Sequence, residues 1–230
     1  MRGSTKSSRS VAVNALKREL IREAAKRVFV ARGLSAASVR EIALQAGYTT
    51  GAIYFHYANK EEIYADVLSG SLAALHEAVS VAAQAEANAL ASLTAAYRAF
   101  IAFYRSHPRD LSLGLYLFEG AGPRGLTAKL NRDLNERFLG VMQIFEAGLG
   151  SAGVSPRERK IEAVALFSEM VGLLIAANTG RLGVFGVDAD TMINRHVAWV
   201  QRRVALLTST RTRAHVRPSG AGRGARRPST

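Results

Sequence analysis

The sequence predicts an all-α protein with a small amino-terminal helical domain followed by a larger helical domain. The 230 residues are 48% hydrophobic and rich in Ala, with only five Pro, a composition that favours helices. Apolar residues recur at spacings of three and four, and no segment shows the alternation of a half-buried strand. Helix-capping residues and glycines mark where the individual helices begin and end.

The first helix is expected from Leu16 to Arg32, where apolar residues lie three and four positions apart. Gly33 follows directly and can adopt the left-handed conformation that ends a helix. Residues 1–13 are basic and Ser-rich and lack the apolar core of a secretory signal. We expect them to form a disordered basic arm.

Two short helices joined by a tight turn are expected in residues 38–57. Ser38 followed by Glu41 is a capping-box pattern for the first of them, which should end at Gly47. The hydroxyl of Thr49 can cap the second, which should run to about Tyr57. Two helices of this length joined by a glycine-containing turn are typical of a helix-turn-helix.

The remaining helices are expected to form one larger domain. Asn59 with Glu62 opens a long helix, and Ser155 with Glu158 gives a second strong start signal. The later helices are expected over Ser92 to Ser106, Asp110 to Phe118, Leu126 to Leu149, Arg157 to Thr179, and Asp188 to about Leu207. The expected organisation is therefore a helix-turn-helix domain over 14–62, a helical domain over 63–207, and a disordered basic tail over 208–230.

Positive charge is concentrated at the two ends of the chain, whose net charge is +13. Residues 1–60 carry eleven Lys and Arg against three Glu, whereas residues 61–201 carry twelve against fifteen acidic residues. Residues 202–230 carry eight Arg and no acidic residue. This distribution favours one small module that binds a polyanion, although a solvated tail that aids solubility would give the same charge.

Four motifs occur together in the amino-terminal part of the chain: the Phe-Val-Ala-Arg-Gly run at 29–33, the Gly47-Tyr48 turn, the GAIYFHY run at 51–57 and the Asn-Lys-Glu-Glu run at 59–62. Together they resemble the DNA-binding signature of the TetR family of bacterial repressors. This resemblance covers about residues 14–68. It implies a dimeric regulator that binds operator DNA, with a variable helical domain for ligand binding and dimerisation.

The DNA-contacting residues are expected on the two short helices and just after them. The second helix of such a motif lies in the major groove while its neighbours contact phosphates. The resemblance implies backbone contacts by Tyr54, His56 and Lys60, and contacts to phosphates or base edges by Thr49, Thr50 and Ala52; Arg40 could reach either. Ile53 and Phe55 are expected to face the core. Taken singly, Tyr54 could be a core aromatic and Lys60 an ordinary surface lysine.

Aromatic and thioether side chains of the larger domain are candidates for an effector site between helices. The candidate lining residues are Phe100, Phe103, Tyr104, Tyr116, Phe138, Met142, Phe145, Phe167, Glu169 and Met170. Filling of the core is the alternative for each aromatic residue. Glu169 interrupts an apolar helix and must be paired, solvated or directed into a cavity, where it could orient a ligand.

The last two long helices carry faces of small and apolar residues that a monomer would leave exposed. The candidate dimer-interface residues are Ser168, Gly172, Ile175, Ala176, Thr179, Ile193, Val197, Val200 and Val204. A symmetric four-helix interface would bury them. Packing within one protomer, onto the preceding long helix, is the alternative.

The sequence therefore favours a cytoplasmic, ligand-responsive repressor that a small apolar or amphipathic effector releases from its operator. An activator, or an architectural DNA-binding protein without an effector, is the alternative. An enzyme is not expected, because the five His show no metal-ligand spacing and no pairing motif with a nucleophile. No cofactor or metal is expected. A membrane partner is not expected either, because the longest apolar stretch, 161–177, is short for a membrane span and carries Glu162 and Glu169.

Overall fold

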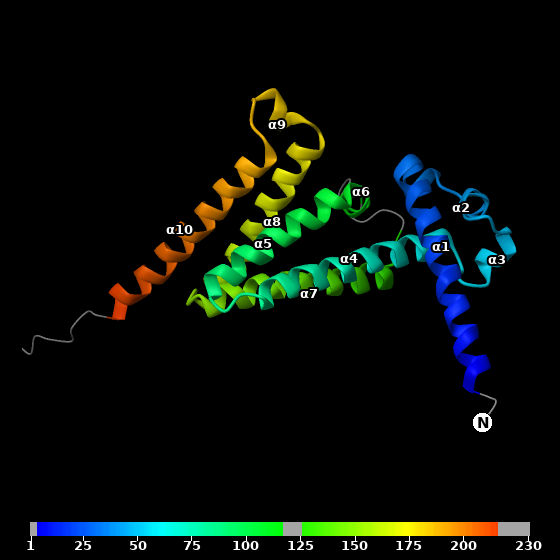
Figure 1. The fold of residues 1–230 in the computed structure, drawn as a ribbon, viewed down its shortest axis with the longest axis horizontal. Helices are drawn as coiled ribbons and strands as arrows, with labels where there is room; N and C mark the ends of the chain where they lie inside the picture. Colours follow the sequence, from blue (N-terminus) through cyan, green and yellow to red (C-terminus); the bar gives the residue numbers. More distant parts are fainter. Residues whose placement is uncertain (1–3, 117–125, 216–230) are drawn as a thin grey trace, which may run out of the picture.

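The structure of the protein is a computed structural model that describes residues 4–116 and 126–215, with side chains described over 11–114 and 126–209. Within these ranges all regular structure is helical. A small domain built by the first helices lies at one end of the molecule, and the longer helices form a bundle beside it (Figure 1). The expected all-α fold, with a small and a larger helical domain, is confirmed.

The amino-terminal domain packs three helices against the beginning of a fourth. These are α1 (Ser4–Ala36), α2 (Val39–Ala46), α3 (Thr50–Tyr54) and the first turns of α4 (Lys60–Gln84). The ring of Phe29 on α1 meets that of Tyr64 on α4 edge to face, with centroids 5.0 Å apart. Ile42 of α2 and Ile53 of α3 are fully buried against them. The domain therefore has an apolar core of its own.

Helix α1 is longer than expected, because it begins at Ser4 instead of Leu16. The structure corrects the disordered arm expected over residues 1–13: residues 4–13 are helical, and residues 1–3 lie outside the described part of the chain. Once a helix exists, each further residue adds a backbone hydrogen bond without new nucleation. The extension buries little, since Val11 is 66% exposed and Val13 is 44% exposed.

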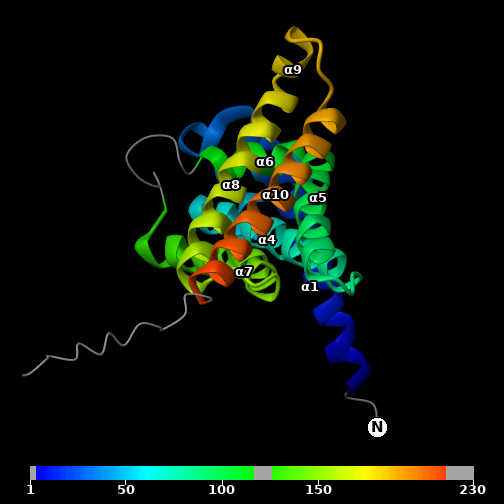
Figure 2. The same cartoon turned by 90° about the vertical axis from the view of Figure 1, so that its left-hand side faces the viewer.

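The larger domain contains the rest of α4 and six further helices. They are α5 (Ala89–Ser106), α6 (Pro108–Tyr116), α7 (Ala128–Ser151), α8 (Pro156–Asn178), α9 (Arg181–Val184) and α10 (Ala189–His215). Helix α4 packs on α5 and α7, while α8 and α10 pack together and against α5 (Figures 1 and 2). The helices that were expected in this domain begin and end within about one turn of their predicted ends, except that α10 ends later.

Helix α10 continues past Leu207 to His215. The disordered tail expected over residues 208–230 is therefore helical over 208–215, and residues 216–230 lie outside the described part of the chain. The hydroxyl of Thr208 donates to the carbonyl of Val204, at 3.0 Å, within the continued helix. As in α1, extending a helix that is already formed is easier than starting one.

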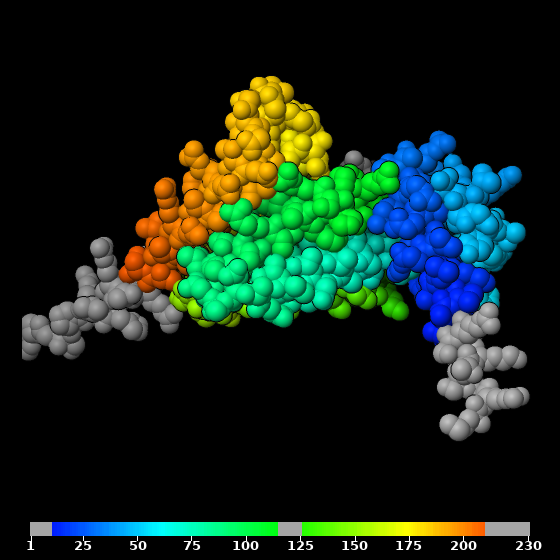
Figure 3. Space-filling view, in the orientation of Figure 1, coloured from blue at the N-terminus to red at the C-terminus, as the bar shows by residue number. Residues whose placement is uncertain are grey.

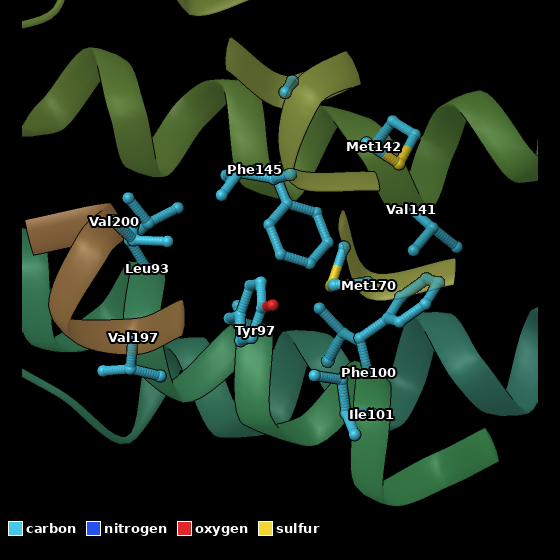
Figure 4. Packing of buried hydrophobic residues seen from close by; sticks show 14 of the residues in the cluster. Leu93, Tyr97, Phe100, Ile101, Val141, Met142, Phe145, Met170, Val197 and Val200 are labelled. Atoms are coloured by element: carbon cyan, nitrogen blue, oxygen red, sulfur yellow. The ribbon is translucent and has the colours of Figure 1, made fainter. Parts of the chain in front are cut away.

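Large side chains from α5, α7, α8 and α10 fill the core of the larger domain (Figure 4). Tyr97, Phe100, Phe145 and Met170 are almost completely buried there. The rings of Phe100 and Phe145 lie edge to face with centroids 6.2 Å apart, a favourable geometry for aromatic pairs. This core holds the long helices in a fixed arrangement, against which a ligand site or an interface can be positioned.

Helix α6 joins the two domains. Leu113 is buried in the amino-terminal core, whereas Leu111, two residues earlier, is buried in the core of the larger domain. The hydroxyl of Tyr64 on α4 donates to the carbonyl of Leu113 at 2.6 Å, in a buried position. A displacement of α6 would therefore change the side-chain packing of both cores.

Helix α8 is long and apolar enough to cross a membrane by length and composition alone, and 28% of its most apolar window is buried. Its inner side places Leu166 and Met170 in the core, while Ile161 and Val164 are exposed on its outer side. A helix that packs on two surfaces is apolar around most of its circumference. The space-filling view shows α9 and the adjoining parts of α8 and α10 projecting from the bundle (Figure 3).

Candidate functional site

Local hydrogen bonds build the turn between α2 and α3 as the sequence predicts. The amide of Glu41 donates to the hydroxyl of Ser38 at 3.2 Å, and the Ser38 amide donates to the Glu41 carboxylate at 3.2 Å. Gly47 ends α2 in the left-handed conformation, with φ 73° and ψ 27°. The hydroxyl of Thr49 then accepts from the amide of Ala52, at 3.2 Å, and starts α3. The helix-turn-helix is thus fixed by interactions that span three residues.

The end of α3 turns a set of aromatic side chains outward. Ile53 is fully buried as expected, but Phe55, which was expected to face the core, is 79% exposed. Ile53 and Tyr57 lie one turn apart and occupy the buried positions, so the residues between them point away from the core. Tyr54 is 54% exposed, and the ring of His56 contacts that of Phe55 at 5.1 Å. The exposed Phe55 is a feature that sequence reasoning missed.

The other expected DNA-contacting residues lie around the same surface. Arg40 and Thr49 are exposed, whereas Thr50, Ala52 and His56 are partly buried. Ala52, Phe55 and His56 line a shallow groove between α1 and α3. We call the set Arg40, Thr49, Thr50, Ala52, Tyr54, Phe55 and His56 the α2–α3 surface.

Lys60 has a structural role that the sequence did not indicate. Its ammonium group donates to the backbone carbonyls of Ser35, at 2.8 Å, and Ala37, at 3.1 Å. These bonds tie the start of α4 to the end of α1 and to the link that follows it, and they use two of the three donors of the lysine. Lys60 therefore stabilises the domain, and a phosphate contact would have to use its remaining donor.

A second set of contacts, centred on Asp66 of α4, stabilises the amino-terminal domain behind the α2–α3 surface. The hydroxyl of Tyr57 donates to Asp66 at 2.6 Å, and Arg18 of α1 approaches the same carboxylate at 3.1 Å. The Arg18 guanidinium also lies over the Tyr57 ring, 5.2 Å from its centroid. Burial, followed by the bond to Asp66, raises the pKa of Tyr57 to about 12. The hydroxyl thus stays protonated at neutral pH and donates to Asp66, while Arg18 ties α1 to the same carboxylate of α4.

An apolar cavity of about 80 Å³ lies in the larger domain beside α6. Four of the expected effector-site residues line it, namely Phe100, Tyr104, Phe138 and Phe167. Leu68, Leu72, Leu111, Leu134 and Val171 form the rest of the apolar wall, and Asp110 is the charged residue among the described lining residues. Burial, and then the charge of Asp110, raise the pKa of Tyr104 above its ordinary value of 10.0, so its hydroxyl stays neutral.

The other expected effector-site residues do not line this cavity. Met142, Phe145 and Met170 are buried in the core, as the alternative interpretation held, because their helix faces point towards neighbouring helices. Phe103 faces a separate cleft. Glu169 pairs with Arg203 of α10, which neutralises its charge without a ligand. The side chain of Tyr116 lies outside the described part of the chain.

The second cleft, of about 290 Å³, adjoins the apolar cavity, and five of its lining side chains are charged. It lies between α1, α4 and α5, and it shares Ser71 and Asp110 with the cavity. Lys26 of α1 pairs there with Asp110 at 2.9 Å. The sequence does not connect these two residues, since each one alone resembles an ordinary surface charge of a helix.

The proposed interface face of α10 is corrected by the structure. Ile193, Val197, Val200 and Val204 are buried within the protomer, because this side of α10 packs on α5 and α8. On α8, Ser168, Gly172, Ile175 and Thr179 are exposed and Ala176 is partly buried. Further apolar side chains are exposed on the same two helices, namely Ile161, Val164, Trp199 and Leu206. We call these four residues and the exposed α8 residues the α8–α10 outer face.

Residues 21–67 match the model of the family described as bacterial regulatory proteins, tetR family. A 60-residue segment is 45% identical to the HTH-type transcriptional repressor KstR2 of Mycobacterium tuberculosis, and it covers 26% of this chain and 30% of that protein. Across the curated relatives, the matched segments span from 24% to 58% of the relative's length. The sequence relationship is therefore strongest in the amino-terminal domain.

Solved structures share the fold over most of the chain. A tetR-family regulatory protein from Rhodococcus RHA1 aligns with a TM-score of 0.68 and 21% identity, over 82% of this chain and 96% of that one. The regulator FadR from Bacillus subtilis, solved in complex with stearoyl-CoA, aligns with a TM-score of 0.61 and 20% identity, over 83% and 97% of the two chains. At this level of identity the likeness establishes the all-helical architecture.

Proposed function

We propose that this chain, whose amino-terminal domain is of the TetR family, is a transcriptional regulator that binds operator DNA as a dimer and is released by a small effector. The observation that carries the proposal is the capped α2–Gly47–α3 turn, which directs the α2–α3 surface outward. Repressors among the relatives favour repression over activation. A regulator of this kind acts on the chromosome and so in the cytoplasm.

DNA binding is proposed through α3 in the major groove. Tyr54 and His56 offer hydrogen-bonding groups for phosphates, while the exposed ring of Phe55 can contact thymine methyl groups or sugars. Arg40 and Thr50 are the residues of this surface that could read base edges. With Gly51 and Ala52 in the middle of α3, DNA shape would carry part of the specificity.

Dimerisation is proposed through the α8–α10 outer face. In the protomer, Ile161 is 56% exposed, Val164 is 63% exposed and Leu206 is 67% exposed. Exposed apolar side chains gathered on two neighbouring helices are typical of a protein interface. A two-fold axis beside α8 and α10 would bury them in a four-helix arrangement and hold two α3 helices at a fixed separation.

The effector site is proposed in the apolar cavity beside α6. The solved FadR complex with stearoyl-CoA shows that one protein of this fold binds a molecule with a long apolar chain. The cavity of this chain has an apolar wall and touches α6, which joins both domains. An apolar or amphipathic effector that displaces α6 would shift the amino-terminal domain and misplace α3 relative to the next major groove.

The test of this proposal is selection of an operator from a pool of random duplexes, followed by binding measurements at several salt concentrations. We expect a two-fold symmetric sequence that one dimer binds at least about 10³ times more tightly than random DNA. Sequence-independent binding would support the architectural alternative instead. Failure to bind DNA would exclude both.

A further inference from the structure

Asp110 is a buried carboxylate that lies between the apolar cavity and the charged cleft. Its side chain is only 4% exposed, and it contributes to the wall of both spaces. Lys26 approaches from α1 on the side of the cleft, with its nitrogen 2.9 Å from the carboxylate. The same nitrogen lies 3.5 Å from the carboxylate of Glu23, which is more exposed. Lys26 thus has a second acidic partner within reach, whereas among the described residues Lys26 is the cation that pairs with Asp110.

The position of Asp110 restricts the charge of a molecule that can occupy the cavity next to it. A neutral molecule that separated Asp110 from Lys26 would leave a buried carboxylate without a counterion, which is strongly unfavourable. An anionic molecule would add a like charge to the site. A cation can replace Lys26, because it restores the pair at Asp110 while Lys26 keeps Glu23.

We propose that the effector of this protein is an amphipathic amine, whose protonated nitrogen pairs with Asp110 in place of Lys26. Its apolar part lies among Phe100, Phe138 and Phe167 in the cavity. The ammonium group donates to a carboxylate oxygen that now accepts from Lys26. This inference rests on the proposed function, because it names the ligand class of the same effector site.

The exchange of partners also gives a route to the DNA-binding domain. The pair of Lys26 and Asp110 connects α1 directly to α6, and Leu113 of α6 lies in the core of the amino-terminal domain. Breaking the pair releases α1 from the larger domain at this point. The position of the α2–α3 surface relative to the bundle then changes, and operator affinity falls.

The size of the cavity determines the first probes. At about 80 Å³ it is smaller than most ligand sites, so a small molecule is suitable and a larger one must widen the wall. A matched set is 2-phenylethylamine, 2-phenylethanol and phenylacetate, which are cationic, neutral and anionic at pH 7. A second set with 4-phenylbutyl chains extends the apolar part while keeping the same end groups.

Binding of these six compounds is measured by calorimetry on the DNA-free full-length protein. We expect each amine to bind at least about tenfold more tightly than its alcohol, because a charge-assisted bond at a buried site is worth that much. The carboxylates should bind most weakly. Equal binding within a set, tighter binding of the alcohol or carboxylate, or no binding by either amine would overturn the proposal.

Two substitutions should change amine binding in opposite directions. Asp110→Asn should reduce the preference for amine over alcohol to less than about threefold, whereas Lys26→Met should strengthen amine binding by about tenfold because it removes the competing cation. Lys129→Met, at an exposed position of α7, is the matched control and should change neither value. Thermal unfolding verifies that each variant is folded. Even if Asp110→Asn does not fold, unchanged or weaker amine binding by Lys26→Met would overturn the proposal.

Operator release is measured separately, so that the class of ligand and the release of DNA by that ligand are tested independently. If the amines bind as described but operator affinity stays constant, the ligand class stands and release by this effector site is wrong. If the alcohols or carboxylates release the operator and the amines do not, regulated release stands and the amine class is wrong.

Discussion

The charged side chains of the amino-terminal domain divide into those used inside the protein and those directed to solvent. Arg18 is held by Asp66 and Tyr57, and Lys60 is held by two backbone carbonyls. Arg40, by contrast, lies exposed near the start of α2 beside the proposed groove-binding helix. A substitution at Arg40 therefore tests DNA binding more directly than one at Lys60, whose loss would also destabilise the fold.

Arg40→Ala should weaken DNA binding without affecting the stability of the domain. If Arg40 contacts a phosphate, the slope of log K against log salt should fall by about 0.9 per protomer, or about twice that in a symmetric dimer. If it reads a base, the preference among operators should change by about 1–3 kcal/mol. Fluorescence anisotropy at several salt concentrations measures both. Arg132→Ala, exposed on α7, is the control, and an equal effect of the two would contradict the assignment of the α2–α3 surface.

His196 gives the larger domain a pH-dependent stability. Its Nδ1 lies 3.0 Å from the Tyr97 hydroxyl, and its ring stacks on Trp199 with centroids 5.1 Å apart. Burial lowers the pKa of His196 below its ordinary value of 6.5. As the pH falls through 6.5, the unfolded chain takes up a proton before the folded one does. The contribution of His196 is therefore complete above about pH 6.5 and is lost as the pH falls towards its folded pKa.

His196→Gln should accordingly make the stability of the protein less dependent on pH. Urea unfolding at pH 7.5 and 5.5 measures it, and the wild type should lose more stability between these values than the variant does. Arg195→Gln, on the exposed side of the same helix, is the control. A wild type and a His196→Gln variant with the same loss would show that the buried histidine does not titrate in this range.

At the scale of helices, the starts of α2, α3, α4 and α8 could be predicted because their caps are local. Ser38, Thr49, Asn59 and Ser155 each accept a hydrogen bond from an amide three residues later, so the sequence contains both partners. The outward face of α10 could not be predicted in this way. It carries apolar residues on two sides, and only the positions of α5 and α8 decide that Val200 is buried and Trp199 exposed.

The candidate site likewise contains features that local sequence specifies and features that depend on the packing of distant helices. The residues of α2 and α3 could be located from the spacing of Ser38, Gly47 and Thr49, whereas the exposed side of α3 depended on how Ile53 and Tyr57 pack. The hydrogen bonds from Lys60 to the carbonyls of Ser35 and Ala37 join residues that are far apart in the chain, and so does the ion pair of Lys26 with Asp110. Such contacts exist only once the helices have packed, and a helical pattern does not specify them.

Two glycines of the helix-turn-helix should respond to Ala in opposite directions. Gly47 has a φ of 73° and open space where a methyl group would lie, so Gly47→Ala should cost about 1 kcal/mol through backbone strain alone. Gly51 is helical and also has open space, so Gly51→Ala should stabilise α3 by roughly 0.5–1 kcal/mol. Thermal or urea unfolding compares them. Equal signs would contradict the left-handed turn as the feature that ends α2.

At the scale of the whole molecule, the two cores share α4 and are also joined by α6 and by α7, whose Leu134 and Val141 lie in different cores. Leu68 of α4 is buried in the amino-terminal core, while Leu75 of the same helix is buried in the larger domain. Leu113 and Leu111 make the corresponding connections from α6. With three helices that contribute to both cores, a shift in one domain must be accommodated by the other, because packed cores do not deform freely. Under the proposed function, this arrangement would let an effector in the cavity beside α6 alter DNA binding.

The proposed dimer interface, the α8–α10 outer face, also concerns the whole molecule. One α3 helix alone would give little specificity, and a dimer through this face would hold two of them one helical turn of DNA apart. Val164 lies on this face and is 63% exposed, so Val164→Asp leaves the protomer core intact. In a dimer formed through this face, the new carboxylate would be buried in the interface without a counterion. Such burial should shift the protein towards monomer and reduce operator affinity.

Analytical ultracentrifugation at micromolar concentration distinguishes this effect from general loss of stability. Val184→Asp makes the same chemical change in α9, where the valine is 83% exposed and lies outside the outer face, and this variant should remain dimeric. Helical circular dichroism should be the same for both variants. If Val164→Asp were as fully dimeric as Val184→Asp, the two-fold axis would have to lie elsewhere, and the exposed apolar residues of α8 and α10 would need another partner.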